Sequence, residues 1–262
     1  MKTKWVSAPY LVWMTVFIAV PLLMIAVFAF TTNDGEFTVK NIQDVGQYAN
    51  IFFRSIWLSV IATAICLVVA YPVSFILSRM EKHKQATMLM IVMLPMWMNF
   101  LLRTYAWMTL LGNNGVINHL LGLIGIGPLK LINTSGAVVL GMVMILPLYS
   151  VMVKIDKSVI EAASDLGCSG VATLFRVIVP LSLPGITSGV TMVFVPAIST
   201  FIISRMLGGG SNLLIGDLIE MQFLGNAYNP HLGAAISLVL MVIILVIMTV
   251  MNQFSPDDQV LI

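Results

Sequence analysis

The segment DKSVIEAASDLGCSGVATLFRVIVP, residues 156–180, interrupts a chain that is otherwise strongly apolar. It separates two runs, at about 134–153 and 185–204, that contain no acidic or basic residue, and each is long enough to cross the hydrocarbon core of a bilayer. Across the 262 residues, charged side chains make up 9% and apolar ones 59%, with a mean hydropathy of +1.01. A soluble domain contains about 25% charged residues and could not bury so much apolar surface. The composition therefore predicts a membrane protein.

Further runs of the same kind lie on both sides of this segment. Together they give six predicted spans, at about 8–31, 55–78, 87–111, 134–153, 185–204 and 233–252. A backbone in lipid must satisfy its hydrogen bonds internally, and continuous apolar runs lack the alternation of a membrane barrel. We therefore predict an all-α membrane protein with six transmembrane helices in a single domain over residues 1–262. The first run is too long for a signal peptide and is interpreted as a retained helix.

The basic residues predict the orientation of these spans. If the N-terminus is cytoplasmic, the inner segments hold eight Lys and Arg residues and the outer segments four. Positive charge is favoured in short cytoplasmic segments. This excess predicts a multi-pass protein with both termini in the cytoplasm, together with the segment at about 154–183.

That inner segment is predicted to form two short helices. Ser158, followed three residues later by Glu161, has the spacing of a capping box, in which each side chain pairs with a backbone group at a helix start. Gly167 can adopt the left-handed conformation that often ends a helix. A second helix is expected from about Val171 to Val179 and should stop at Pro180.

The two short helices are open to two interpretations. They could simply anchor the loop at the membrane surface, or they could form a rigid peg that docks into another protein. The second interpretation rests on apolar side chains among few charges, namely Val159, Ile160, Leu174, Phe175 and Ile178.

Glu-Ala-Ala at 161–163, Gly167 and Val-x-Val-Pro at 177–180 resemble the EAA loop of ABC importer permeases. Valines replace the isoleucine and leucine of the family pattern, which keeps the apolar character. The resemblance implies a type I ABC importer permease fold with this loop between the fourth and fifth helices. In that family the loop is a coupling helix that docks on an ATPase subunit. The resemblance thus assigns ATPase coupling to Glu161, Ala162, Ala163, Gly167 and Pro180.

A narrower resemblance covers most of the chain. Segments that resemble spermidine/putrescine importer permeases lie at 101–107, 110–112, 115–118, 196–210 and 212–220. This resemblance implies the first of two permeases in a bacterial cell membrane complex, with a second permease, two ATPase subunits and an external polyamine-binding protein. The chain has no G-x-x-x-x-G-K-[ST] loop, so ATP and Mg²⁺ are expected on the ATPase. No cofactor and no nucleic-acid partner is expected for this chain.

A polyamine path should offer carboxylates for the amines and aromatic faces for cation–π contact. Asp217 and Glu220 lie three residues apart and would share a helical face near the outer mouth. The aromatic candidates are Trp97, Tyr105, Trp107 and Tyr228. Two alternatives stay open, because the aromatics also fit an interfacial belt and the acids also fit a solvated loop or a docking surface for the binding protein.

Two further features concern helix packing. A charge at Arg103, inside the third predicted span, would cost about 2.5–3.5 kcal/mol at the centre of a membrane helix. We therefore expect Arg103 to pair with an acid from another helix or subunit, or else to bind an anion. Gly185 and Gly189 form a G-x-x-x-G motif that fits a close contact with the second permease.

Recognisable catalytic and metal-binding motifs are absent from the sequence. It contains neither H-E-x-x-H nor G-x-S-x-G, and its two cysteines lack metal-ligand spacing. An enzyme is therefore not expected. Two rivals to the polyamine permease remain: an ABC importer permease for another small solute such as an inorganic anion, and a membrane assembly protein that docks partners without conducting a solute.

Overall fold

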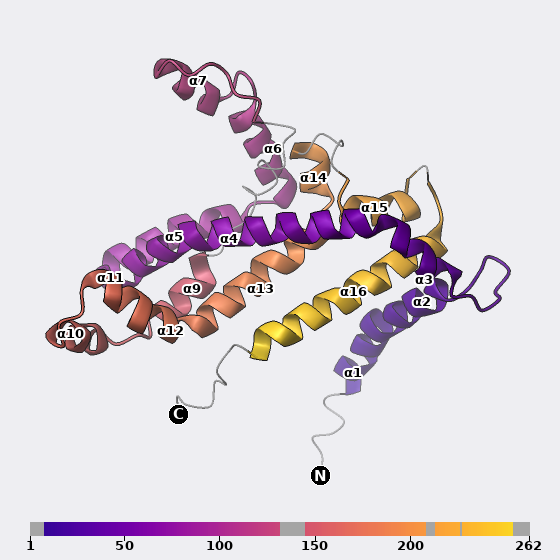
Figure 1. The fold of residues 1–262 in the computed structure, drawn as a ribbon, viewed down its shortest axis with the longest axis horizontal. Helices are drawn as coiled ribbons and strands as arrows, with labels where there is room; N and C mark the ends of the chain where they lie inside the picture. The colour runs from indigo at the N-terminus through magenta and orange to yellow at the C-terminus, as the bar shows by residue number, and fades with distance from the viewer. Residues whose placement is uncertain (1–7, 132–144, 208–212, 226, 254–262) are drawn as a thin grey trace, which may run out of the picture.

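The computed structural model describes residues 8–131, 145–207, 213–225 and 227–253, most of which lie in helices (Figure 1). The helices before the first gap are α1 Ala8–Met14, η1 Thr15–Ala19, α2 Val20–Ala29, α3 Lys40–Val45, η2 Gly46–Tyr48, α4 Ala49–Arg79, α5 Lys82–Trp97, α6 Phe100–Leu111 and α7 Val116–Leu123. Those after it are α9 Ile145–Met152, α10 Lys157–Asp165, α11 Gly170–Thr173, η3 Leu174–Ile178, α12 Val179–Leu181, α13 Leu183–Ser199, α14 Ile202–Leu207, α15 Ile215–Phe223 and α16 Pro230–Gln253.

Three helical segments are long and apolar enough to cross a membrane: Pro9–Ala29, Lys40–Arg79 and Pro230–Met251. Two further segments are bent pairs of helices: α5 pairs with α6 and α7, and α11–α12 pairs with α13. If each pair crosses the membrane once, the described residues contain up to five spans. The predicted span at 134–153 lies mostly outside the described residues, and α9 covers only its end. The helical membrane fold is confirmed, whereas the count of six spans stays a prediction.

Prolines change the helix geometry at two places. A π-helical turn at Thr15–Ala19 precedes Pro21, and another at Leu174–Ile178 precedes Pro180. A proline ring clashes with the carbonyl four residues back, and the wider π turn moves that carbonyl away. The prediction that the second loop helix stops at Pro180 is therefore wrong. The helix continues to Leu181 and then bends by 70° into α13.

The run predicted as one span at 87–111 forms two helices. α5 and α6 meet at an angle of 90°. Asn99 lies at the break, and its side-chain Oδ1 accepts a hydrogen bond from the Leu101 N–H at 2.8 Å. An asparagine in this position satisfies a donor that a helix start leaves free, so α6 begins anew after the bend.

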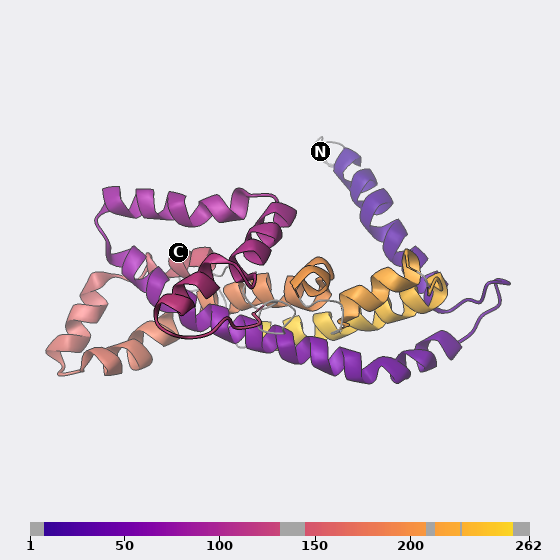
Figure 2. The same ribbon diagram turned by 90° about the horizontal axis from the view of Figure 1, so that it is seen from above.

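The long helices separate the two ends of the molecule. α4, α9 and α13 pack together, and α16 packs on α2, α3 and α15 (Figures 1 and 2). With 31 residues, α4 is about 45 Å long. The hairpin formed by α10, α11 and α12 lies at one end of α4, and α3 and α15 lie at the other. The two candidate sites are therefore far apart, and α4 runs between them.

The N-terminal segment Pro9–Ala29 projects from the rest of the chain (Figure 2). None of its apolar window is buried within the molecule, and only its end packs on α16, where Ala29 is fully buried. A helix that is apolar on all sides requires lipid or another protein around it.

Candidate functional site

The first helix of the α10–α12 hairpin begins one residue before the predicted cap. α10 starts at Lys157, and the Asp156 side chain caps it by accepting a hydrogen bond from the Ser158 N–H at 3.0 Å. This bond holds the pKa of Asp156 below its usual value. The predicted capping box of Ser158 and Glu161 is therefore wrong, because Ser158 already lies inside the helix and Asp156 accepts the free donor.

The end of α10 follows the prediction. Gly167 has a φ of +81°, the left-handed conformation expected of it. Its N–H donates to the Ser164 carbonyl at 2.9 Å, and the Cys168 N–H donates to the Ala163 carbonyl at 3.0 Å. These two bonds form a Schellman motif, which satisfies carbonyls that a helix end leaves free. A Cβ at Gly167 would meet no atom within 4 Å, so the backbone angle alone favours glycine here.

The residues assigned to coupling lie mostly on the surface. Glu161, Ala162, Gly167 and Pro180 are exposed, whereas Ala163 is buried against the rest of the hairpin. Of the five predicted apolar anchors, the structure exposes two and covers the others in part or fully; the exposed ones are Val159 and Phe175.

Two apolar residues of the hairpin were missed by the sequence analysis. Leu166 is 86% exposed, and Val171 is also exposed. They flank the turn between α10 and α11, on either side of Gly167. The signal that could have found them is position, because a side chain beside a left-handed glycine at the tip of a hairpin has no neighbouring helix to cover it. The exposed apolar surface of the hairpin therefore extends around the turn.

The hairpin is attached to α4 by polar contacts that sequence reasoning did not anticipate. Arg79 Nη1, in the last turn of α4, donates to the Ile155 carbonyl at 3.2 Å, directly before α10. At the other end of the hairpin, the hydroxyls of Tyr71 and Ser182 lie 2.9 Å apart. An apolar groove of about 710 Å³ lies between these contacts, lined by α4 and by residues of the hairpin such as Leu174. A displacement of the hairpin would therefore act on α4 at two points.

At the opposite end of the molecule, Asp217 lies in the first turn of α15 and is only 7% exposed. Its Oδ2 accepts hydrogen bonds from the Ser204 hydroxyl at 2.6 Å and from the Leu214 N–H at 2.9 Å. A carboxylate at this position also interacts favourably with the positive end of the helix dipole. In this conformation Asp217 joins α14 to α15 and does not face solvent.

Glu220 lies one turn further along α15. Both of its carboxylate oxygens accept from Nη1 of Arg205 on α14, at 2.8 and 3.0 Å. Asp217 and Glu220 both contact α14, as expected for two acids that share a helical face. Each already has a partner within the chain, so their role in a substrate path stays a prediction.

The four candidate aromatics are not brought together. Trp107 is half-buried and packs with Leu111, Leu207 and Leu214, which places it beside the end of α14 and the start of α15. Trp97, Tyr105 and Tyr228 are exposed. Among the described residues, Trp107 is thus the candidate aromatic that packs against α14 and the start of α15, the helix that contains Asp217 and Glu220.

Within this chain Arg103 has a backbone partner, and its pairing with an acid of another subunit stays a prediction. Its Nη1 donates to the Pro95 carbonyl at 3.4 Å, and its guanidinium carbon lies 5.6 Å from the centroid of the Phe100 ring. No acid contacts it among the residues that the structure describes. Pro95 belongs to the last turn of α5, where carbonyls lack helical partners and a cation is favourable. Arg103 therefore stabilises the bend between α5 and α6.

The G-x-x-x-G motif packs inside the chain. A Cβ at Gly185 would lie 2.9 Å from the Val151 side chain, and Gly189 is buried as well. The glycine at 185 therefore permits α13 to approach α9. The expected contact between this position and a second permease is replaced by an internal one.

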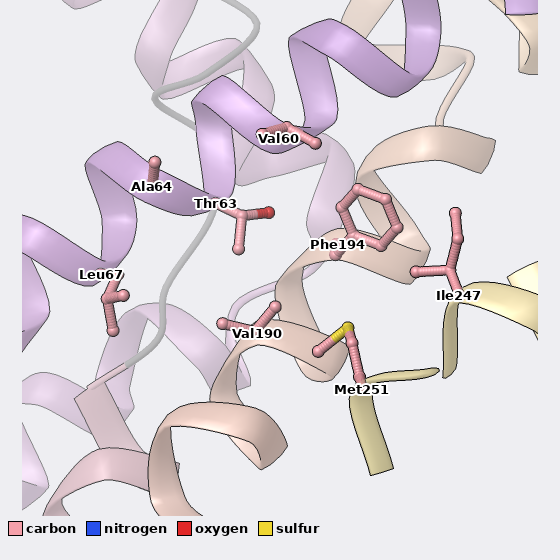
Figure 3. Close-up of a pocket in the computed structure, with 8 residues that line it drawn as sticks. All are labelled: Val60, Thr63, Ala64, Leu67, Val190, Phe194, Ile247 and Met251. Carbon is pink, nitrogen blue, oxygen red and sulfur yellow. The ribbon is translucent and has the colours of Figure 1, made fainter. Parts of the chain in front are cut away.

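An apolar pocket of about 310 Å³ lies between α4, α13 and α16 (Figure 3). Leu67, Phe194 and Ile247 are among its lining residues, and Thr63 is the polar one. The Thr63 hydroxyl donates to the Ser59 carbonyl at 2.7 Å and is therefore satisfied. The pocket offers no charged group, so it is not a candidate site for an ammonium ion.

Comparisons with known proteins show the family of the chain. A family model described as "Binding-protein-dependent transport system inner membrane component" matches residues 70–257. The chain is 37% identical over 247 residues to the spermidine/putrescine transport system permease protein PotB of Haemophilus influenzae, which covers 88% of this chain and 86% of the relative. PotB of Escherichia coli is 35% identical over the same length, covering 88% and 90%.

Among solved structures, a bacterial ABC transporter involved in the import of the acidic polysaccharide alginate has a similar fold. Its chain superposes with a TM-score of 0.73 at 17% identity, covering 96% of this chain and 93% of that one. A second crystal structure of an alginate ABC transporter, in complex with an alginate pentasaccharide-bound periplasmic protein, has the same TM-score and identity and covers 95% and 91%.

Proposed function

Because the chain belongs to the family of binding-protein-dependent transport system inner membrane components, we propose that it is one permease subunit of an ATP-driven importer that carries polyamines. The proposal of a polyamine substrate rests on the sequence identity of 35–37%, over 88% of the chain, to permeases of spermidine/putrescine systems. The similarity to the alginate transporter concerns the fold alone. An inorganic anion is a less favoured substrate, because these relatives belong to spermidine/putrescine systems.

We infer that the hairpin couples ATP hydrolysis to transport. The exposed surface around Glu161, Ala162, Leu166 and Gly167 supports a docking role, because it is partly apolar and held rigid by caps at both ends of α10. ATP and Mg²⁺ would bind two separate ATPase subunits, and their closure would displace the hairpin. The contact between Arg79 and the carbonyl before α10 would carry this displacement to α4.

The remaining subunits and the orientation are part of the same proposal. A second permease would complete the path, and an external binding protein would deliver the polyamine at the end that holds α3 and α15. Both termini would be cytoplasmic, as the distribution of lysine and arginine suggests. The proposed path includes the exposed and half-exposed candidates Trp97, Tyr105, Trp107, Glu220 and Tyr228, with Asp217 available only after α14 moves away from α15.

Uptake of labelled spermidine and putrescine tests the proposal. The chain would be reconstituted in liposomes with its proposed partners, namely a second permease, an ATPase and a binding protein, and sulfate and a sugar would serve as control solutes. We expect ATP-driven uptake of the polyamines that requires the binding protein. Uptake of a control solute alone would keep the importer and reject the polyamine, and an assembled complex that imports nothing would favour the docking protein.

A further inference from the structure

The carboxylate of Glu220 is already occupied by a cation of the same chain. Arg205 on α14 reaches it through Nη1, at 2.8 Å from Oε1 and 3.0 Å from Oε2. A polyamine would bring an ammonium group to the same oxygens. Arg205 and a polyamine would therefore compete for one carboxylate, because both are cationic hydrogen-bond donors.

We propose that Arg205 is a specificity-determining residue, a built-in competitor that leaves Glu220 when a polycation arrives and returns when it departs. This inference rests on the proposed function, since it takes a polyamine as the substrate. It adds Arg205 to the proposed substrate path, which the sequence analysis built from acidic and aromatic residues alone.

The geometry of the ion pair fits exchange. Only one nitrogen of the guanidinium contacts Glu220, so the pair does not use the two-nitrogen fork that makes arginine–carboxylate pairs strong. The Arg205 side chain is 63% exposed and that of Glu220 is 21% exposed. Solvent screens such a pair, and measured values for exposed pairs correspond to about a two- to fivefold change in an equilibrium constant.

Asp217 is not equivalent to Glu220 in this respect. It is buried, and its Oδ2 accepts hydrogen bonds from the Leu214 N–H and the Ser204 hydroxyl, so a ligand could reach it only after α14 moves away from α15. Glu220 is therefore the member of the pair that can exchange partners without a separation of the two helices.

Competition of this kind serves both selectivity and release. A monovalent cation offers a single charge to replace Arg205, whereas a polyamine has further ammonium groups that bind nearby and raise its effective concentration. A site that conducts must also release its substrate, which requires weak or multiple contacts. The returning guanidinium would lower the affinity of Glu220 for the departing amine.

A double-mutant cycle tests the proposal. Spermidine would be titrated into the assembled complex in lipid nanodiscs, without the binding protein, for wild type, Arg205→Gln, Glu220→Gln and the double variant. We expect Arg205→Gln to tighten spermidine binding about two- to fivefold and Glu220→Gln to weaken it. In the Glu220→Gln background, Arg205→Gln should have no further effect, because the carboxylate under competition is gone.

The matched control is Lys84→Gln. Lys84 and Glu81 form an exposed ion pair of 3.1 Å near the opposite end of α4, and its loss removes one positive charge without touching Glu220. Spermidine affinity should be unchanged. An equal gain in affinity from Arg205→Gln in both backgrounds would indicate general repulsion and overturn the proposal, as would no gain at all.

Failure of the inference and failure of the proposed function are distinguishable. Wild-type liposomes that import no polyamine would reject the function and, with it, the competition. Wild-type uptake together with an additive cycle would reject only the role of Arg205. Thermal unfolding of each variant complex would identify a loss of binding that arises from misfolding.

Discussion

Replacing Gly167 should uncouple ATP hydrolysis from transport. An alanine at a φ of +81° places its Cβ too close to the following carbonyl, which costs about 1–2 kcal/mol. No packing change offsets or adds to this strain, because a Cβ here meets no atom within 4 Å. At 1.36 kcal/mol for each factor of ten, the population of the capped hairpin should fall about 5- to 30-fold relative to opened forms.

The assay measures polyamine uptake and ATP hydrolysis on the same proteoliposomes. In Gly167→Ala, the number of ATP molecules hydrolysed for each polyamine imported should rise, because a loosened hairpin transmits less of the ATPase movement. Gly167→Asn should restore much of the coupling, since asparagine tolerates the left-handed conformation better than alanine.

Gly170→Ala is the matched control for this experiment. It adds the same methyl group to the same hairpin, also with no atom within 4 Å, but Gly170 does not have a positive φ. An unchanged coupling ratio in Gly167→Ala, when hydrogen exchange proves that the end of α10 has opened, would refute the reasoning. An equal change in Gly170→Ala would refute it too.

Three further predictions concern the caps and the packing. The Ser158 N–H lowers the pKa of Asp156 in the folded protein, so the stabilisation of α10 by Asp156 is present above the unfolded pKa of about 4 and is lost as the pH falls through the folded value. Hydrogen exchange of α10, corrected for the intrinsic pH dependence of exchange, should therefore accelerate in acid. Asp156→Ala should abolish that dependence. Asp217→Ala removes the carboxylate that accepts from the buried Leu214 N–H and from the Ser204 hydroxyl, and it should lower the free energy of unfolding by about 1–3 kcal/mol in a denaturant titration; an unchanged midpoint would contradict its structural role. Gly185→Ala forces α13 away from α9 and should lower thermal stability by an amount corresponding to about 1–3 kcal/mol, whereas Gly122→Ala, which adds a methyl to open space, should not.

Features that depend on composition and short spacing could be predicted from the sequence. The scarcity of charge required a membrane, and lipid requires helices, so the fold class follows without any contact being known. The left-handed Gly167 is likewise a local property, since it depends on a helix end and on the missing side chain. The cap of α10 was misassigned although its signal was also local: Asp156 precedes Ser158 and is an equally good cap.

The partners of charged side chains could not be predicted in the same way. Arg103 was expected to pair with an acid of another helix or subunit or to bind an anion, and within this chain the bend between α5 and α6 brings it to a carbonyl of the preceding helix. Asp217 and Glu220 were interpreted as carboxylates of a polyamine path, a solvated loop or a docking surface, and the return of α14 against α15 gives each of them a partner within the chain. Bends and returns of this kind depend on packing between whole helices.

The sequence by itself determined that the protein lies in a membrane and that it is helical, and it predicted a coupling loop at 156–180, because each of these follows from residue type within a short window. The tertiary structure decided which charges are free, which glycines are packed and how the hairpin is joined to α4. Those outcomes depend on atoms far apart in the chain, whose distances are set only when the helices bend and pack against one another.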